Sequence, residues 1–405
     1  MKVSNFSKLG LCAPLVHVLE RLDMTEPTEV QKKTIPVALA GQDVLASAET
    51  GSGKTAAFLL PIIERLKQPG QARALVLAPT RELALQIEEN ARGFSRAARL
   101  RAVSIVGGES VSRQIKAINS GVDILIATPG RLNDLIERGA VSLKVIEVLV
   151  LDEADRMLDM GFLPQVRRIV KHLPAERQTM MLTATLSRPV EQLAREMLGN
   201  YARVEVERSV ATVATLTQKA YPVLSHAKTP MLLSMLKQHQ EGSFLVFTRT
   251  RRGADRLSRI LAAHSHNVAV LHSDRSQSQR NTALASFRSG RARVLVATDI
   301  AARGIDVDGI SCVINYEVPE TAEDYVHRVG RTARAGRNGS ALTLVSPEEE
   351  ATLAVIERCT GVRLERAKLH GFSDGRSEEQ IRLTSEIARL RSPSARSFRP
   401  NRRSR

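Results

Sequence analysis

The sequence predicts an α/β protein of two tandem domains, each built on a mostly parallel β-sheet with helices on both faces. Short, continuous apolar runs alternate with longer helical patterns, and this cycle occurs twice along the chain. Continuous rather than alternating apolar runs are typical of strands that are covered on both faces. The length of 405 residues also exceeds that of one ordinary domain. Two domains followed by a short tail therefore account for the chain.

The predicted strands form two groups. The first group lies at residues 43–47, 73–78, 104–106, 123–127, 147–151 and 179–183. The second group lies at residues 244–247, 268–271, 293–297, 312–314 and 341–345. The stretch between the groups, residues 207–218, has no sustained apolar period. We therefore expect an N-terminal domain at residues 1–207, a linker at 208–218, a C-terminal domain at 219–371 and a tail at 372–405.

The net charge indicates a polyanionic partner. Lys and Arg number 59 against 43 Asp and Glu, which gives a formal net charge of +16. Residues 363–405 contain twelve basic and five acidic residues, a charge of +7, so the rest of the chain carries +9. The last stretch, residues 391–405, has six Arg among Ser and Pro, a composition that predicts disorder. This end either tethers nucleic acid or only keeps the protein in solution.

Cysteine spacing and hydropathy argue against other classes of protein. Cys12, Cys312 and Cys359 lie far apart, with no Cys/His cluster, so neither a disulfide framework nor a zinc site is indicated. The N-terminus lacks the apolar core of a signal peptide, and no apolar run approaches the roughly 18 residues of a membrane span. We expect a cytoplasmic protein without a membrane partner.

A phosphate-binding loop follows the first predicted strand. In AETGSGKT, residues 48–55, Gly51 and Gly53 let backbone amides turn toward phosphates, and Lys54 can reach the terminal phosphates. The Thr55 hydroxyl can bind Mg²⁺ at the start of the next helix. Ala48 stands where the strict pattern has its first Gly. A glycine loop without a ligand is the alternative, and the position between a strand and a helix disfavours it.

Three acidic residues follow a buried strand in VLVLDEADRML, residues 148–158. Ligands of α/β sheets bind beyond the carboxyl ends of the strands, so Asp152 and Glu153 should share an edge with Lys54. Unpaired buried carboxylates are costly, and Mg²⁺ on nucleotide phosphates would remove that cost. Asp152 is the expected Mg²⁺ ligand, and Glu153 would orient the attacking water or accept its proton. The alternative is a helix N-terminus that merely carries acidic residues.

With these two segments the chain resembles the DEAD-box RNA helicases. It contains, in the order of that family, PTREL (79–83), GG (107–108), TPGR (128–131), DEAD (152–155), TAT (183–185), VFTRT (246–250), ATDIAARGID (297–306) and HRVGRTAR (327–334). The match runs from residue 6 to about residue 345. The resemblance implies two tandem RecA-like domains. It also implies an RNA-stimulated ATPase that locally unwinds short RNA duplexes or remodels ribonucleoprotein.

The resemblance implies which residues bind ATP. Gln31, in EPTEVQ, would read the adenine base and Phe6 would pack near it; an ordinary surface amide and a core anchor are the alternatives. Asp306 would contact the ribose, and Thr55 and Asp152 would hold Mg²⁺. The expected nucleotide contacts are Phe6, Gln31, Ala48, Glu49, Thr50, Gly51, Ser52, Gly53, Lys54, Thr55 and Asp306.

A further group would complete the ATPase site and couple it to RNA. Arg331 and Arg334 are three residues apart and therefore on one face of a helix. By resemblance they are arginine fingers that reach the γ-phosphate from the second domain. His327 would help to couple the two sites. In the TAT motif, the Thr183 hydroxyl would bond the DEAD segment and pass the nucleotide state to the RNA face, and Thr185 belongs to the same coupling motif. A basic surface helix and a buried strand end are the alternatives.

The RNA contacts implied by the resemblance lie on both domains and address the backbone, so binding should be independent of base sequence and sensitive to salt. They are Thr80, Arg81, Gly107, Gly108, Thr128 and Arg131 on the first domain, and Thr248, Arg249, Arg280 and Thr298 on the second. Thr80 as a helix cap and Pro129 at a first helical position offer a purely structural alternative. Contacts to the 2′-hydroxyl would tell RNA from DNA.

The chain departs from the family pattern at a few positions. Asp23 and Met24 stand in place of Gly-Phe before the Gln31 segment, and Ser273 and Ala333 each replace a Gly. We expect the added methyl group of Ala333 to be tolerated.

Two other functions fit part of the pattern. An ATP-dependent RNA clamp or scaffold would use the same sites without separating strands, and a DNA helicase of a related superfamily would share the phosphate loop. The intact hydrolysis motifs disfavour an inert scaffold, and the Gln31 segment and the DEAD tetrad disfavour DNA. We expect a monomer that acts on ribosomal precursors or with RNA-decay machinery; the short tail contains no folded RNA-binding module that would choose between them.

Overall fold

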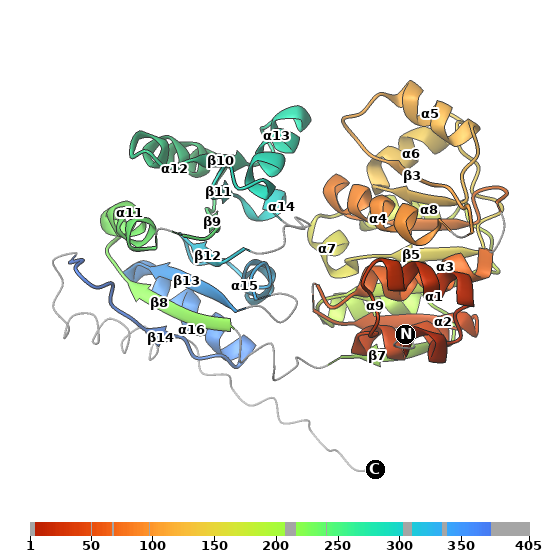
Figure 1. Ribbon diagram of the computed structural model, residues 1–405, viewed down its shortest axis with the longest axis horizontal. Helices are drawn as coiled ribbons and strands as arrows, with labels where there is room; N and C mark the ends of the chain where they lie inside the picture. Colours follow the sequence, from red (N-terminus) through yellow and green to blue (C-terminus); the bar gives the residue numbers. More distant parts are fainter. Residues whose placement is uncertain are drawn as a thin grey trace, which may run out of the picture. The chain divides into compact units, whose positions relative to one another are not determined.

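The computed structural model describes residues 5–49, 51–66, 69–96, 98–206, 216–239, 241–302, 310–333 and 338–373. The chain divides into two compact units, and the described parts of the first end at residue 206 while those of the second begin at residue 216 (Figure 1). Each unit contains one seven-stranded sheet in which all strand pairs are parallel. The predicted fold class is confirmed.

The strands of the first unit lie in the order β3-β4-β2-β5-β6-β1-β7. They are β1 (Asp43–Ser47), β2 (Ala74–Leu77), β3 (Ala102–Ile105), β4 (Ile124–Ala127), β5 (Val148–Leu151), β6 (Gln178–Thr183) and β7 (Tyr201–Glu205). The helices are η1 (Asn5–Leu9), α1 (Ala13–Arg21), α2 (Glu29–Leu39), α3 (Lys54–Leu66), α4 (Arg81–Phe94), α5 (Val111–Asn119), α6 (Pro129–Glu137), α7 (Ala154–Asp159), α8 (Leu163–Val170) and α9 (Arg188–Met197).

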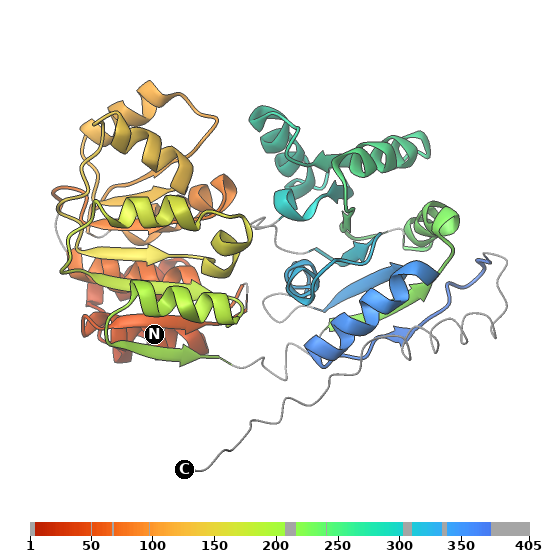
Figure 2. The ribbon, with the colours of Figure 1, turned by 180° about the vertical axis from the view of Figure 1, so that it is seen from behind.

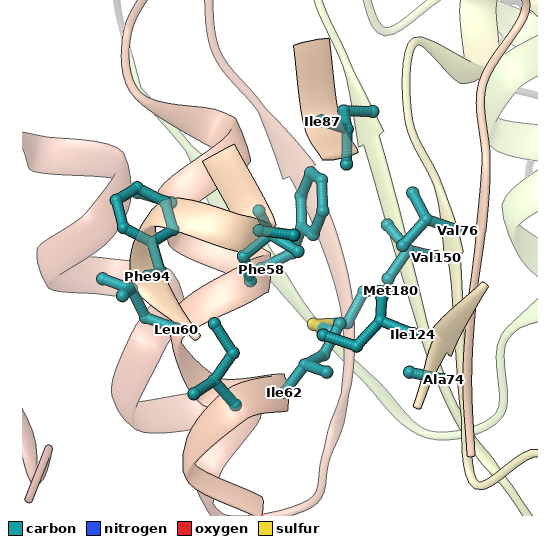
Figure 3. Packing of buried hydrophobic residues seen from close by; sticks show 14 of the residues in the cluster. Phe58, Leu60, Ile62, Ala74, Val76, Ile87, Phe94, Ile124, Val150 and Met180 are labelled. Atoms are coloured by element: carbon teal, nitrogen blue, oxygen red, sulfur yellow. The ribbon is translucent and has the colours of Figure 1, made fainter. Parts of the chain in front are cut away.

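Both faces of this first sheet are buried, because alternate residues of each central strand enter different cores. Val148 and Val150 of β5 pack with helices α1 to α4, whereas Leu149 and Leu151 pack with helices α6 to α9. Figure 3 shows Phe58 of α3 facing strand side chains of the first core. Figure 2 shows the yellow and lime helices of the second layer in front of the strands. This double burial is the physical reason for the continuous apolar runs in the sequence.

The strands of the second unit lie in the order β10-β11-β9-β12-β13-β8-β14. They are β8 (Leu216–Pro222), β9 (Phe244–Phe247), β10 (Val268–Leu271), β11 (Val294–Ala297), β12 (Cys312–Asn315), β13 (Gly339–Val345) and β14 (Glu365–Arg366). The helices are η2 (Ser225–Ala227), α11 (Lys228–Gln238), α12 (Arg251–Ala263), α13 (Gln277–Arg288), α14 (Asp299–Ala302), α15 (Ala322–Val329), η3 (Pro347–Glu349) and α16 (Glu350–Thr360). One core packs α11 and α12 against the sheet, and another packs α15 and α16.

Each predicted strand is present, and its ends differ from the prediction by no more than two residues. The prediction missed β7, β8 and β14. Residues 216–218, which the sequence assigned to the linker, are the first residues of β8. Most residues of β7 and β8 are exposed or half-buried, and only Val204 of β7 and Ala220 and Pro222 of β8 are buried, so neither strand contains the continuous apolar run on which the prediction relied.

The start of the predicted tail also needs correction. Phe372, its first residue, is partly buried against the core that contains α11 and α12. The remaining linker residues, 208–215, and the tail from residue 374 onward lie outside the described residues. Within the described ranges, no helix is long and apolar enough to span a membrane.

Candidate nucleotide site and nucleic-acid surface

The predicted functional residues that follow strands of the first unit lie at the carboxyl edge of its sheet, and the strand order separates them into two groups. The predicted RNA residues follow β2, β3 and β4, which form one side of the sheet. The phosphate loop follows β1, and the TAT motif lies at the end of β6, on the other side. Strand β5, which delivers the DEAD segment, lies between β2 and β6. The DEAD segment is therefore placed at the boundary between the two groups.

The phosphate loop connects β1 to α3, which begins at Lys54. Gly51 and Gly53 have φ values of 85° and 92°, which a residue with a side chain adopts only at a cost. The Lys54 ammonium donates hydrogen bonds to the backbone carbonyls of Ala48 and Glu49, the latter at 3.1 Å. The Lys54 side chain therefore folds back onto the phosphate loop. Thr50 lies outside the described residues.

Gln31 reaches the phosphate loop from α2. Its side chain is 2% exposed, accepts a hydrogen bond from the Thr28 backbone N–H (2.9 Å) and donates one to the Gly53 carbonyl (3.1 Å). A Cβ atom on Gly53 would collide with the Gln31 amide nitrogen. The alternative of an ordinary surface amide is therefore wrong. The adenine contact of Gln31 stays a prediction.

Phe6 is fully buried in the first core of the first unit, where it packs with side chains of α1 and α2. This position agrees with the alternative in which Phe6 anchors the core. Its contact with adenine stays a prediction.

Asp152 and Glu153 follow β5 directly. Asp152 is 3% exposed, and its Oδ1 accepts a hydrogen bond from the Glu153 backbone N–H at 3.0 Å. Burial, together with the negative charge of Glu153, raises the pKa of Asp152 to about 7, although Lys54 acts in the opposite direction. A carboxyl group with this pKa is only partly ionised at neutral pH, and a cation beside it would favour the charged form.

Glu153 occupies the N-cap position of α7, in a left-handed conformation with φ of 53°, and its side chain makes no capping hydrogen bond. Its carboxylate instead accepts a hydrogen bond from the buried Arg156 guanidinium at 2.7 Å. The alternative of acids that merely support a helix N-terminus is therefore disfavoured. A left-handed residue other than Gly costs about 1 to 2 kcal/mol, and such strain is often retained at functional sites.

The TAT motif bonds the DEAD segment through Thr185. The Asp155 carboxylate accepts hydrogen bonds from the backbone N–H groups of Ala184 (2.9 Å) and Thr185 (3.0 Å) and from the Thr185 hydroxyl (3.2 Å). The Thr183 hydroxyl, which the sequence assigned to this role, donates to the Thr185 carbonyl at 2.8 Å. Thr183 therefore supports the motif from within. The assignment of Asp155 as the joint between the two motifs was missed.

The predicted RNA residues of the first unit are organised around Glu109. The Arg81 guanidinium donates to the Glu109 carboxylate at 3.2 Å, and the Arg131 guanidinium donates to the Glu109 backbone carbonyl at 3.1 Å. Gly108 has a φ of 73°, and a Cβ atom there would collide with Arg81. Two arginines and the Gly107–Gly108 turn therefore form one surface.

The structural alternative holds in part for the two threonines of this surface. The Thr80 hydroxyl accepts a hydrogen bond from the Leu83 N–H at 3.3 Å and so caps α4. Pro129 occupies the first turn of α6, as predicted, but the Thr128 side chain makes no capping hydrogen bond. Both threonines are at least nine-tenths buried.

The predicted RNA residues of the second unit also follow neighbouring strands, β9, β10 and β11, at the carboxyl edge. Thr248 and Thr298 are 1% and 7% exposed. Arg249 lies beside two acidic residues. Its backbone N–H donates a hydrogen bond to the Glu317 carboxylate (2.6 Å), and its guanidinium donates one to the Glu349 carboxylate (3.4 Å). Arg280 lies in the first turn of α13. As RNA contacts, these four residues stay predictions.

The HRVGRTAR segment differs from the predicted continuous helix. Helix α15 ends at Val329, so Arg331 lies in the turn that follows. The expectation that Arg331 and Arg334 share a helical face is therefore wrong for Arg331. Arg331 is 4% exposed, and its Nε donates to the His327 carbonyl at 3.2 Å. Arg334 and Asp306 lie outside the described residues.

Ala333 adopts a left-handed conformation with φ of 55°. The Gly that usually stands at this position adopts that conformation without penalty, whereas an alanine costs about 1 kcal/mol. The substitution is thus accommodated in the fold, but at a backbone cost that the sequence did not indicate.

Sequence reasoning missed Arg328. This residue is 2% exposed and donates two hydrogen bonds to Asp299 (2.6 and 2.7 Å), one to Asn315 (3.2 Å) and one to the Glu317 carbonyl (2.8 Å). Its guanidinium also lies over the Phe247 ring, 5.0 Å from the centroid. Arg328 therefore joins the ends of β9, β11 and β12.

The sequence did contain a sign that Arg328 is buried. It lies three residues after Tyr325, which places a charged side chain on the apolar face of the helix.

Together, the two parallel sheets and the phosphate loop define a pair of tandem RecA-like domains. A family model described as DEAD/DEAH box helicase matches residues 28–193, and one described as helicase conserved C-terminal domain matches residues 227–336. The chain is 40% identical over 367 residues to the DEAD-box ATP-dependent RNA helicase CshA of Geobacillus kaustophilus, which covers 90% of this chain and 79% of that protein. This chain belongs to the family of DEAD-box ATP-dependent RNA helicases.

A second curated relative and a solved structure are also similar to this chain. The DEAD-box ATP-dependent RNA helicase RhpA of Helicobacter pylori is 40% identical over 354 residues, 87% of this chain and 72% of that protein. A solved structure of S. cerevisiae Dbp5 bound to RNA and ADP BeF3 is similar with a TM-score of 0.81 and 28% identity, and the match covers 95% of this chain and 100% of that chain.

The raised pKa of Asp152 predicts a pH-dependent stability. The pKa is about 7 in the folded protein and about 3.8 in a model peptide, so between these values the folded state binds a proton that the unfolded state has lost. The free energy of unfolding therefore falls as the pH rises through this window. Asp152→Asn should stabilise the nucleotide-free protein, and the gain should be about 2 to 3 kcal/mol larger at pH 8 than at pH 5. Denaturation of the first unit at both pH values measures this gain.

Asp134→Asn is the matched control, since the Asp134 side chain is 36% exposed on α6. It makes the same change of side chain outside the site, so its effect at each pH is the baseline for the Asp152→Asn gain. An Asp152→Asn gain that does not depend on pH would contradict the assignment.

A second prediction concerns Arg328. Arg328→Ala should destabilise the second unit by about 3 kcal/mol, because it leaves Asp299 without its buried cation. The double variant Arg328→Met with Asp299→Asn should recover much of this loss. Hydrogen exchange at β12 reports the change, and the exposed Arg252→Ala serves as control. A loss no larger than that of the control would show that the cluster is dispensable.

Proposed function

We propose that this chain couples ATP hydrolysis to the local separation of short RNA duplexes or to the remodelling of ribonucleoprotein. The observation that carries the proposal is the division of the carboxyl edge in the first unit. The phosphate loop and the predicted RNA surface lie on opposite sides of β5, and the DEAD segment lies between them. ATP and RNA can therefore be bound at the same edge without competing for the same residues.

The ATP site is proposed to divide the work among a few side chains. Lys54 and the loop amides hold the phosphates, and Gln31 reads the adenine through the amide that already contacts Gly53. Glu153 orients the attacking water or accepts its proton. Asp306 contacts the ribose. These roles follow the family pattern, and the buried, preorganised geometry of Asp152 and Gln31 supports them.

The donor set fits Mg²⁺. Asp152 supplies a hard carboxylate oxygen, and Thr55 supplies a hydroxyl at the start of α3. Among the described residues, no three His, Cys, Asp or Glu side chains gather into a metal site, so nucleotide phosphates and water would have to supply the remaining Mg²⁺ ligands. When bound, Mg²⁺ would neutralise phosphate charge and the buried Asp152 carboxylate.

The second unit is proposed to complete the ATPase. Arg331 and Arg334 act as arginine fingers toward the γ-phosphate, and His327 helps to couple this site to RNA. The Arg331 side chain is already joined to the His327 backbone, because its Nε donates a hydrogen bond to the His327 carbonyl. Because closure over both ligands assembles the fingers, RNA should stimulate hydrolysis.

RNA recognition is proposed to be independent of base sequence. Arginines, hydroxyl groups and helix N-termini bind phosphates, and such contacts carry no base identity. Contacts to the 2′-hydroxyl would select RNA over DNA. We further propose that the protein acts in the cytoplasm as a monomer, on ribosomal precursors or with RNA-decay machinery. Crosslinking in cells followed by sequencing of the bound RNA identifies the target.

The proposal is tested by comparing ATPase stimulation with single-stranded RNA and DNA of equal length. A helicase of this class should be stimulated strongly by RNA and weakly by DNA. Separation of a short duplex in the presence of ATP then distinguishes a helicase from an ATP-dependent clamp, which would bind RNA without separating strands. Equal stimulation by DNA would contradict the RNA assignment.

Glu153→Gln should abolish ATP turnover and preserve binding of ATP and RNA. The substitution removes the group that activates water and keeps a side chain of the same size. Turnover at saturating RNA and the dissociation constants for both ligands measure the two effects. Normal turnover in this variant would exclude Glu153 from the role.

Deletion of residues 374–405 should weaken RNA affinity at moderate salt and leave maximal RNA-stimulated ATPase nearly intact. The deletion removes a basic segment but keeps Phe372, which packs on the second unit. RNA binding at several salt concentrations measures the effect. An unchanged affinity would exclude the tail from RNA binding.

A further inference from the structure

A second basic site lies at the amino edge of the first sheet, opposite the carboxyl edge that carries the motifs. A hollow of about 380 Å³ lies where α4 ends, where the chain enters β3, and where α5 ends. Its polar lining consists of Glu88, Arg92, Ser95, Arg96, Arg99 and Arg101. We call this feature the α4–β3 hollow.

The α4–β3 hollow carries an excess of positive charge. Four arginines face one carboxylate, that of Glu88, and this carboxylate already accepts a hydrogen bond from Arg92. Arg101 donates to the Ser120 carbonyl at 2.8 Å. Within the described ranges, neither Arg96 nor Arg99 has an acidic partner closer than 4 Å. Two guanidinium groups are therefore available to an anion.

A buried hydroxyl adds a second observation. Ser95 is 1% exposed, and its backbone N–H bonds the Ala91 carbonyl at 2.8 Å. Its hydroxyl oxygen is buried and has no hydrogen-bond partner in the part of the chain that the structure describes. Such an unsatisfied group is costly in a folded protein, and an oxygen of a ligand would satisfy it. The hollow thus offers a neutral donor beside two arginines.

The position of the hollow relates it to RNA. Strand β3 is the terminal strand of its sheet, with Gly107 and Gly108 just beyond its carboxyl end and the hollow at its amino end. The strand has four residues and is therefore only about 13 Å long. A polyanion held at the Gly107–Gly108 turn can continue along this edge of the first unit and reach the hollow.

We propose that the α4–β3 hollow binds the phosphate backbone of RNA that extends beyond the motif surface. Arginine matches phosphate geometry with its planar fork, and a hollow of a few hundred Å³ accommodates one nucleotide unit. None of the described lining residues has an aromatic side chain on which a base could stack, so this contact should not depend on base identity. The proposal rests on the RNA-binding function proposed above and adds a second site to it.

The test uses the full-length chain with the double variant Arg96→Ala/Arg99→Ala and single-stranded RNA of about 8 and about 25 nucleotides. Affinity is measured at several salt concentrations. For the long RNA, the variant should bind about tenfold more weakly at low salt, and the slope of log affinity against log salt should fall by about 1.4, for two lost phosphate contacts on a single strand. The short RNA should bind as it does to the unchanged protein.

Lys144→Ala/Lys171→Ala is the matched control. Both lysines are exposed, precede β5 and β6 at the same amino edge, and lie outside the hollow. This control removes the same charge but should leave the difference between long and short RNA intact. Ser95→Ala, which removes only the buried hydroxyl, should weaken binding of the long RNA several-fold without loss of stability.

Three outcomes would overturn the proposal: equal losses for both RNA lengths, equal losses in the lysine control, or an Arg96→Ala/Arg99→Ala variant that binds the long RNA normally. The last outcome would exclude the hollow from RNA binding. Failure of the proposed function is distinguishable, because the unchanged protein would then show no RNA-stimulated ATPase.

Discussion

The parallel register of the first sheet is the constraint on which the site depends. It brings the loops after six successive strands to one edge, and the strand order then decides which of them are neighbours. Strand β5 carries Asp152 between the nucleotide loop and the predicted RNA surface. Because both flanking strands are buried on two faces, a small displacement of this edge is resisted by close packing. The same rigidity allows one carboxylate, Asp155, to hold the TAT motif in place.

The second unit repeats this division with a different joint. Its predicted RNA residues follow β9, β10 and β11, whereas α15 follows β12. Arg328 connects the two groups through Asp299 and Asn315, and it lies three residues before Arg331. A buried ion pair of this kind contributes little net stability but fixes geometry, because an alternative arrangement would leave a buried charge unpaired. Arg328 thus fixes the position of the turn that contains Arg331 relative to the strands that precede the predicted RNA residues.

The sequence predicted features that have a local cause. Continuous apolar runs gave the central strands, and Gly51, Gly53 and Lys54 identified the phosphate loop. The prediction failed for elements whose structure depends on contacts with distant segments. Strand β8 is half-polar, and β13 pairs with it along its full length. The end of α15 at Val329 and the role of Thr185 rather than Thr183 likewise depend on contacts between distant segments. Side-chain partners across the sheet edge carry no signature in a single sequence.

The arginines of the predicted RNA surface are already engaged by oxygens of the protein itself. Arg81 and Arg131 bond Glu109, and Arg249 lies among Glu317 and Glu349. A phosphate must therefore replace an existing anion or carbonyl, and only the difference between the two interactions contributes to affinity. Each contact is consequently weak alone, and tight binding requires many of them at once. Under the proposed function, the added contacts made when ATP and RNA are bound together would raise the affinity for RNA, so the affinity would respond to the nucleotide.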